Sequence, residues 1–130
     1  KGKEIKENNK AAMNFWWAKT DKQIRVEGVC AKVSRKESDD YFSSRPRGSQ
    51  ISAVASKQSE TLDSYESLVR EAKIIQSEHE GKDLLRPNRW GGFILKPNLF
   101  EFWINQGNRL HRRELFILKD KQWEFSFISP

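Results

Sequence analysis

The segment from Tyr41 to Ser59 gathers side chains that can bind an oxyanion. It reads YFSSRPRGSQISAVASKQS and combines two arginines, a glycine and several hydroxyl groups in a short stretch. Guanidinium groups donate paired hydrogen bonds to phosphate oxygens, and hydroxyls and free backbone N–H groups complete such a shell. The pattern indicates a phosphate monoester as ligand, although a polar surface loop has the same composition.

A second basic cluster, NRLHRR, covers residues 108–113. Side chains alternate along an extended segment, so Arg109, His111 and Arg113 are predicted to line one surface. Taken alone, a histidine in such a cluster is more often a surface or hydrogen-bonded residue than a catalytic one. The sequence contains no GxSxG, HExxH, P-loop or GxGxxG motif, which disfavours hydrolases and nucleotide kinases.

Length and composition predict one folded domain. The chain has 130 residues, of which 36% are hydrophobic, with five Trp and eight Phe. The single Cys30 excludes an internal disulfide, and it forms no spaced metal-ligand cluster with His79 and His111. No apolar run approaches the roughly 20 residues that cross a bilayer, and no hydrophobic targeting segment opens the chain. We therefore expect a cytoplasmic protein without a membrane partner.

The net charge of +6 suits an anionic partner. The basic residues alternate with acidic ones, as in KESDD and SEHEG, which weakens the interpretation as a nucleic-acid-binding protein. A basic barrel whose aromatic side chains stack on bases is nevertheless kept as the weakest hypothesis.

The elements that must position these residues alternate between β and α patterns. Residues 11–18 and 23–33 predict an antiparallel hairpin, and Ser34 with Glu37 forms a capping box for a helix over 35–44. Arg45 to Ser49 then follow at a helix exit ahead of a second helix. That second helix is expected from about Asp63 to Gly81, and four β segments follow Trp90: GGFILKP, LFEFWIN, RELFILK and QWEFSFISP. This pattern predicts a mainly antiparallel β-barrel with helical additions.

Four segments, taken together and in order, resemble the pyridoxamine/pyridoxine 5′-phosphate oxidase family. They are FWW…KQIRVEG (15–28), the Tyr41–Ser59 segment, RWGGFILKPNLFEFW (89–103) and NRLHRR (108–113). The resemblance covers almost the whole chain. It implies a single FMN-binding split-barrel domain of Greek-key type over residues 1–130, incomplete at its N-terminus, with a C-terminal dimerisation region over 90–130. It also implies a homodimer that oxidises pyridoxine or pyridoxamine 5′-phosphate with O2 to pyridoxal 5′-phosphate and H2O2.

The resemblance assigns roles to particular residues. Tyr41, Arg45 and Ser49 match the positions that hold the substrate phosphate, where arginine supplies a permanent charge and the hydroxyls supply donors. Arg109 and His111 match the catalytic pair that orients the substrate over the flavin. The positions that match FMN contacts are Lys1, Gln23, Gln58, Ser59, Trp103 and Arg113.

Four features depart from the family pattern. The chain lacks the upstream part of the family, Arg112 stands where Asp is usual, and Phe127 stands where Arg is usual. Residues 104–107, INQG, also differ from the usual motif. These departures support an alternative hypothesis, in which the chain is a fragment or a non-catalytic relative that binds flavin or pyridoxal phosphate, or only dimerises.

Overall fold

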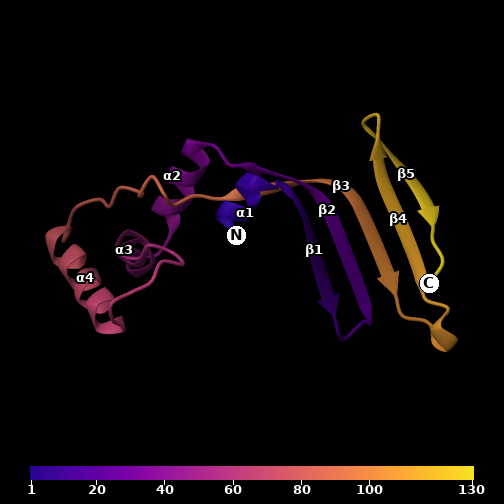
Figure 1. Cartoon of the computed structure of the whole chain (residues 1–130), viewed down its shortest axis with the longest axis horizontal. Coiled ribbons are helices and arrows are strands. Elements are labelled where there is room, and N and C mark those ends of the chain that lie inside the picture. The colour runs from indigo at the N-terminus through magenta and orange to yellow at the C-terminus, as the bar shows by residue number, and fades with distance from the viewer. The chain divides into compact units, whose positions relative to one another are not determined.

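The computed structural model describes all residues from 1 to 130 and divides them into two compact units. The sheet unit comprises Lys1–Ala31 and Phe93–Pro130, and the helical unit comprises Lys32–Gly92 (Figure 1). The helical unit is therefore an insertion between two parts of the chain that build one sheet. No helix has both the length and the apolar composition needed to span a membrane.

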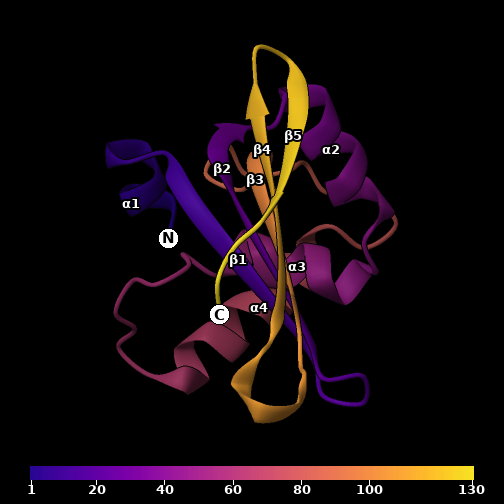
Figure 2. The same cartoon turned by 90° about the vertical axis from the view of Figure 1, so that its right-hand side faces the viewer.

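The sheet unit contains five antiparallel strands in sequence order. After the short helix α1 (Gly2–Glu7), they are β1 (Lys10–Trp17), β2 (Lys22–Lys32), β3 (Phe93–Ile104), β4 (Arg112–Lys119) and β5 (Gln122–Phe127). Figure 2 shows β4 and β5 joined by a tight turn. Asp120 and Lys121 both have positive φ there, at 48° and 66°, as a two-residue hairpin turn that matches the strand twist requires.

A glycine permits the contact between β2 and β3, which are far apart in the sequence. A Cβ added at Gly28 would lie 2.1 Å from the carbonyl oxygen of Lys96. Only a residue without a side chain fits at this approach. Pro97 follows within β3, and its Cα lies 2.8 Å from the same added atom.

Strand alternation gives the sheet two chemically different faces. One face, here called the Trp103 face, carries Trp16, Gln23, Glu101, Trp103 and Arg113. On this face Trp16 pairs with Gln23 across β1 and β2, and Trp103 pairs with Arg113 across β3 and β4. The centroids of the Trp16 and Trp103 rings are 6.0 Å apart. The other, here called the aromatic face, carries Phe100, Phe102, Phe116, Trp123, Phe125 and Phe127, whose neighbouring ring centroids lie 5.0–6.4 Å apart. Several of these aromatic side chains remain exposed.

Three helices form the helical unit: α2 (Arg35–Ser44), α3 (Arg47–Ala55) and α4 (Tyr65–Glu78). Its buried core is small and consists of Phe42, Ile51, Ile75 and Leu84. Two arginines reinforce it by donating to backbone carbonyls at helix ends. Arg47 donates to His79 and Lys82 at 2.7 and 2.8 Å, beyond the end of α4, and Arg89 donates to Ala53, Val54 and Ser56 around the end of α3.

The structure confirms the antiparallel β fold with helices, the first hairpin, and the capped helix over 35–44. The second expected helix is α4, and its N-cap is Ser64, one residue after the expected start. The five strands follow one another in sequence order. Two expectations were wrong in detail: GGFILKP and LFEFWIN belong to the single strand β3, and residues 47–49 already belong to α3, a helix that was not predicted.

Candidate functional site

The helical unit places the three predicted phosphate ligands around the junction of α2 and α3. Tyr41 and Arg45 lie one turn apart at the end of α2, and Ser49 lies in the first turn of α3. Pro46 keeps Arg45 extended, with φ −74° and ψ 150°, so α2 ends there and α3 begins at once. The chain therefore passes from one helix end to the next helix start within two residues.

The start of α3 has unused hydrogen-bonding capacity. Its N-cap, Pro46, has no capping side chain, and the Pro46 carbonyl accepts from the N–H groups of Ser49 and Gln50 at 2.8 and 3.1 Å. The N–H groups of Arg47 and Gly48 lie in the first turn of α3, where no carbonyl of the helix itself can accept from them. The space beside Gly48 is open, since an added Cβ would meet nothing within 4 Å. Such a helix start favours an anion.

Arg45 provides the sharpest indication of a ligand. Its Nη1 atom is buried and has no hydrogen-bond partner, and its guanidinium carbon lies 5.1 Å from the centre of the Trp90 ring. A buried donor on a charged group is costly to leave unpaired. A phosphate oxygen at this position would satisfy it.

Gln58 and Ser59 lie after α3 in an exposed turn of the same unit. The turn is closed by a 3.1 Å hydrogen bond from the Glu60 N–H to the Lys57 carbonyl, and Ser59 has a positive φ of 65°. Both side chains face solvent and are free to contact a ligand.

In the sheet unit, the Trp103 face brings Gln23, Trp103, His111 and Arg113 together. The rings of Trp103 and His111 have centroids 4.6 Å apart, and the Gln106 N–H donates to His111 Nδ1 at 3.3 Å. Because Nδ1 accepts, the proton of the neutral imidazole resides on Nε2. His111 therefore presents an N–H donor on its far side.

Arg113 is fixed by three contacts. Its Nε and Nη2 atoms each lie 2.7 Å from Oε1 of Glu101, a residue 7% exposed, and its Nη1 donates to the Ser129 carbonyl at 2.9 Å. The adjacent Arg112 points to the opposite face, where it pairs with Glu114 and lies 5.5 Å from the Phe127 ring. The two neighbouring cations are thus separated by the strand, and each has its own carboxylate.

The predicted row of Arg109, His111 and Arg113 is not formed as expected. Gly107–Arg109 is a 3₁₀ turn in which Asn108 and Arg109 have positive φ, at 55° and 60°, so strand alternation does not apply to Arg109. Arg109 is exposed on this turn. Lys1 lies at the opposite end of the chain, and its side chain is fully exposed.

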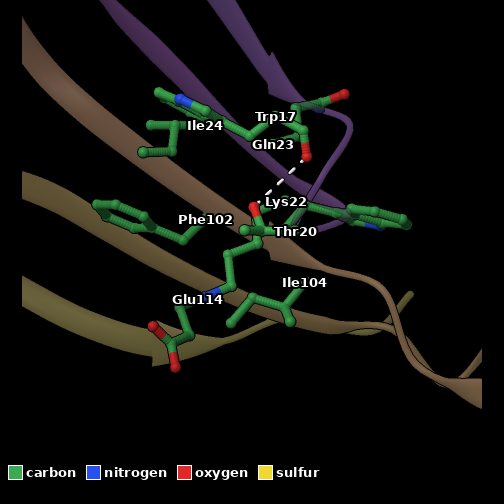
Figure 3. Close-up of a pocket in the computed structure, with 9 residues that line it drawn as sticks. Trp17, Thr20, Lys22, Gln23, Ile24, Phe102, Ile104 and Glu114 are labelled. Atoms are coloured by element: carbon green, nitrogen blue, oxygen red, sulfur yellow. Dashed lines mark hydrogen bonds between the residues drawn. The ribbon is translucent and has the colours of Figure 1, made fainter.

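A hollow of about 380 Å³ adjoins this part of the sheet. The residues lining it are Trp17, Thr20, Lys22, Gln23, Ile24, Phe102, Trp103, Ile104 and Glu114. Figure 3 shows eight of them labelled, with the Thr20 hydroxyl donating to the Trp17 carbonyl. Its size suits a small ligand. Gln23 and Trp103 border it, but Phe102 and Glu114, which pair across β3 and β4, belong to the opposite, aromatic face, so the hollow does not lie wholly on the Trp103 face.

The comparison with family models shows which protein family the chain belongs to. Residues 1–79 match the family described as pyridoxamine 5′-phosphate oxidase, and residues 90–130 match the pyridoxine 5′-phosphate oxidase C-terminal dimerisation region. The chain belongs to the pyridoxamine 5′-phosphate oxidase family.

Individual relatives agree with this membership. Over the whole chain, this oxidase-family protein is 42% identical to the pyridoxine/pyridoxamine 5′-phosphate oxidases of Christiangramia forsetii and Leptospira biflexa. It is 43% identical to that of Trichormus variabilis. The chain spans 61% of the length of each of these curated relatives.

Solved structures support the fold of this family member. The crystal structure of PhzG from Burkholderia lata, in complex with tetrahydrophenazine-1-carboxylic acid, matches the whole chain with a TM-score of 0.90 and 30% identity, over 63% of the PhzG chain. A pyridoxamine 5′-phosphate oxidase-related, FMN binding protein from Nostoc punctiforme matches 99% of the chain, over 67% of its own length, with a TM-score of 0.65. At 12% identity, the second match shows the fold alone.

Sequence reasoning missed two residues of this family member that shape its candidate sites. Glu101 fixes Arg113, and its position two residues before Trp103 in a strand was a usable signal for a polar group on the same face. Trp90 contacts both Tyr41 and Arg45, and no local pattern indicates this, because α2 and Trp90 are far apart in the sequence.

Proposed function

We propose that this chain forms the main part of an FMN-dependent oxidase of pyridoxine or pyridoxamine 5′-phosphate. In the proposed reaction, the 4′ hydroxymethyl group of pyridoxine 5′-phosphate loses two electrons and two protons, one from carbon and one from oxygen, to give pyridoxal 5′-phosphate, and O2 takes them up as H2O2. Pyridoxamine 5′-phosphate would give the same aldehyde after hydrolysis of its imine, with release of ammonia. The observation that carries the proposal is the buried, unpartnered Nη1 of Arg45, a residue that lies two positions before the open, uncapped start of α3.

The substrate phosphate is assigned to the junction of α2 and α3. Arg45 supplies a permanent charge and a buried donor, and Tyr41 and Ser49 supply hydroxyl groups. The free N–H groups at the start of α3 add a partial positive charge. This donor set fits a doubly charged phosphate monoester better than a carboxylate, because it offers several hydrogen-bond donors and a positive charge and contains no carboxylate.

The donor set of the Trp103 face fits FMN. Trp103 and Trp16 provide flat aromatic surface, and Gln23 provides an amide beside them. When bound, FMN would supply the two-electron chemistry that no side chain can provide. Lys1, Gln58, Ser59 and Arg113 are proposed as its further contacts. Arg109 and the Nε2–H of His111 are proposed to orient the substrate's reacting carbon.

An aerobic assay tests this proposal directly. The purified chain is supplied with FMN and pyridoxine 5′-phosphate, and aldehyde and peroxide are followed together. Equal amounts of both products are expected, and unphosphorylated pyridoxine, the matched control, should react much more slowly. No product, with FMN fluorescence unquenched on mixing, would instead favour the fragment or non-catalytic relative suggested by Arg112 and Phe127.

Residues 90–130 are further proposed to hold two copies together, as the description of the matching family region suggests. That residues 1–130 form one domain and that the protein is cytoplasmic both stay predictions.

A further inference from the structure

Trp90 contacts two of the three proposed phosphate ligands through its side chain. Its ring lies 6.0 Å from the Tyr41 ring, at an interplanar angle of 25°, and 5.1 Å from the guanidinium carbon of Arg45. Tyr41 and Arg45 are four residues apart on α2, so they extend from one side of the helix. One indole therefore supports both groups.

The indole itself is held firmly against α2. The buried Phe42 packs edge-on against it, with ring centroids 5.4 Å apart. Arg86, whose side chain is 8% exposed, donates to the Trp90 carbonyl and forms a 2.6 Å ion pair with Asp39 of α2. A hydrogen bond of 2.9 Å from the Trp90 N–H to the Pro87 carbonyl closes the preceding turn. Both the backbone and the ring of Trp90 are thus tied to the helix that carries the ligands.

We infer that Trp90 is a positioning residue for phosphate recognition: its indole holds the Arg45 guanidinium and the Tyr41 ring in the orientation that binds the substrate phosphate. An arginine side chain that is free in solution loses rotamer freedom when it binds a ligand, and a stacked arginine has already lost it. The aromatic face also attracts the cation directly. The inference rests on the phosphate site of the proposed function and adds a residue that touches no substrate atom.

Anaerobic titration of pyridoxine 5′-phosphate into the FMN-loaded chain, followed by calorimetry, tests this inference. Anaerobic conditions prevent turnover, and the alcohol avoids the reaction of an aldehyde with lysines. Trp90→Leu is expected to raise the Kd for pyridoxine 5′-phosphate about tenfold, the size of a partly desolvated cation–π contact. The Kd for unphosphorylated pyridoxine should change by less than about twofold, since the indole acts on the phosphate ligands alone.

Two further variants separate positioning from general damage. Trp90→Phe keeps an aromatic face and should recover most of the lost affinity. Tyr65→Leu removes an exposed aromatic ring from the same unit, outside the proposed site, and should leave both affinities unchanged. If Trp90→Leu weakens both ligands equally, or if Trp90→Phe recovers nothing, Trp90 is only a structural residue and the inference is wrong.

A double-mutant cycle distinguishes failure of this inference from failure of the proposed phosphate site. If Trp90 acts through Arg45, the double variant Arg45→Ala, Trp90→Leu should bind little worse than Arg45→Ala alone, apart from the share due to Tyr41. A loss with Arg45→Ala but none with Trp90→Leu overturns the positioning role and leaves the phosphate site in place. No loss with either variant overturns both.

Discussion

At the scale of single residues, Arg70 is the control for a test of Arg45. Both belong to the helical unit, but Arg45 has a buried, unpartnered nitrogen and Arg70 lies on the exposed side of α4. We expect Arg45→Ala to weaken binding of pyridoxine 5′-phosphate by about 10- to 100-fold, the range for a hydrogen bond to a charged group. Arg70→Ala should change it by less than about twofold, as a distant surface charge screened by salt does. Equal losses in calorimetric titrations would contradict the phosphate assignment.

His111 is expected to affect turnover more than cofactor binding. Its Nδ1 is occupied by the Gln106 N–H, and its ring packs against Trp103 in a tilted arrangement, so only Nε2 is available to a substrate. Replacing it with alanine should lower kcat by roughly 10²-fold, the cost of losing orientation at a reacting centre. FMN retention, measured by fluorescence on the same sample, should stay near the wild-type level. Release of FMN would show that His111 is structural instead.

At the scale of elements, the capping box of α2 links helix stability to pH. The Ser34 hydroxyl accepts from the Glu37 N–H at 3.1 Å, and Glu37 Oε2 accepts from the Ser34 N–H at 2.8 Å. Hydrogen bonds from the Ser34 side chain and backbone lower the pKa of Glu37 below its usual value of 4.5. A carboxyl group with a lowered pKa in the folded state stabilises the fold above its unfolded pKa. This contribution is lost as the pH falls through the folded-state pKa.

Ser34→Ala should therefore lower the free energy of unfolding by about 1 kcal/mol at pH 7, the usual cost of removing an N-cap hydroxyl. The difference from the wild type should shrink as the pH falls below 4.5 and through the lowered folded-state pKa of Glu37, below which this carboxyl is protonated in both states. Urea unfolding of the two proteins at pH 7 and near pH 3 measures this. Ser44→Ala, at the other end of α2, is the control, and a difference that is independent of pH would contradict the coupling.

The elements also show how far the sequence predicts this structure. The helix over 35–44 and the first hairpin follow from local signals, a capping box and an alternating strand, and both are present. The helix α3 was missed because RPRGS has the composition of a loop, although proline is common at a helix start. Burial of Ile51 and the contacts from Arg89 stabilise it, and both depend on distant residues.

The site shows the same division between local and distant information. The identity of the proposed phosphate ligands came from a resemblance, and their proximity follows from α2 ending beside the start of α3. The Arg109 turn was mispredicted because two non-glycine residues adopt positive φ there, which no spacing rule indicates. The pairing of Arg113 with Glu101 depends on the register of β3 and β4, and a local pattern does not determine that register.

At the scale of the whole molecule, the proposed homodimer gives a further prediction. Sedimentation of the purified chain should show two copies in one particle, and truncation after residue 89 should leave monomers, since residues 90–130 match a dimerisation region. Because truncation also removes three strands of the sheet, a second measurement is needed. Cross-dilution of two differently labelled full-length samples should show subunit exchange. A full-length chain that sediments as a monomer at micromolar concentration would contradict the proposal.

The placement of the helical unit between β2 and β3 has a kinetic consequence. The hairpin β1–β2 and the meander β3–β5 each pair neighbours in the sequence and can form early. Joining them requires closure of the Lys32–Gly92 loop, and closing roughly 60 residues costs several kcal/mol of chain entropy unless the helices form first. We therefore expect completion of the sheet to be the slow step of refolding. Substitutions that destabilise α2 or α3 should delay it, and so delay the native contact between Trp16 and Trp103.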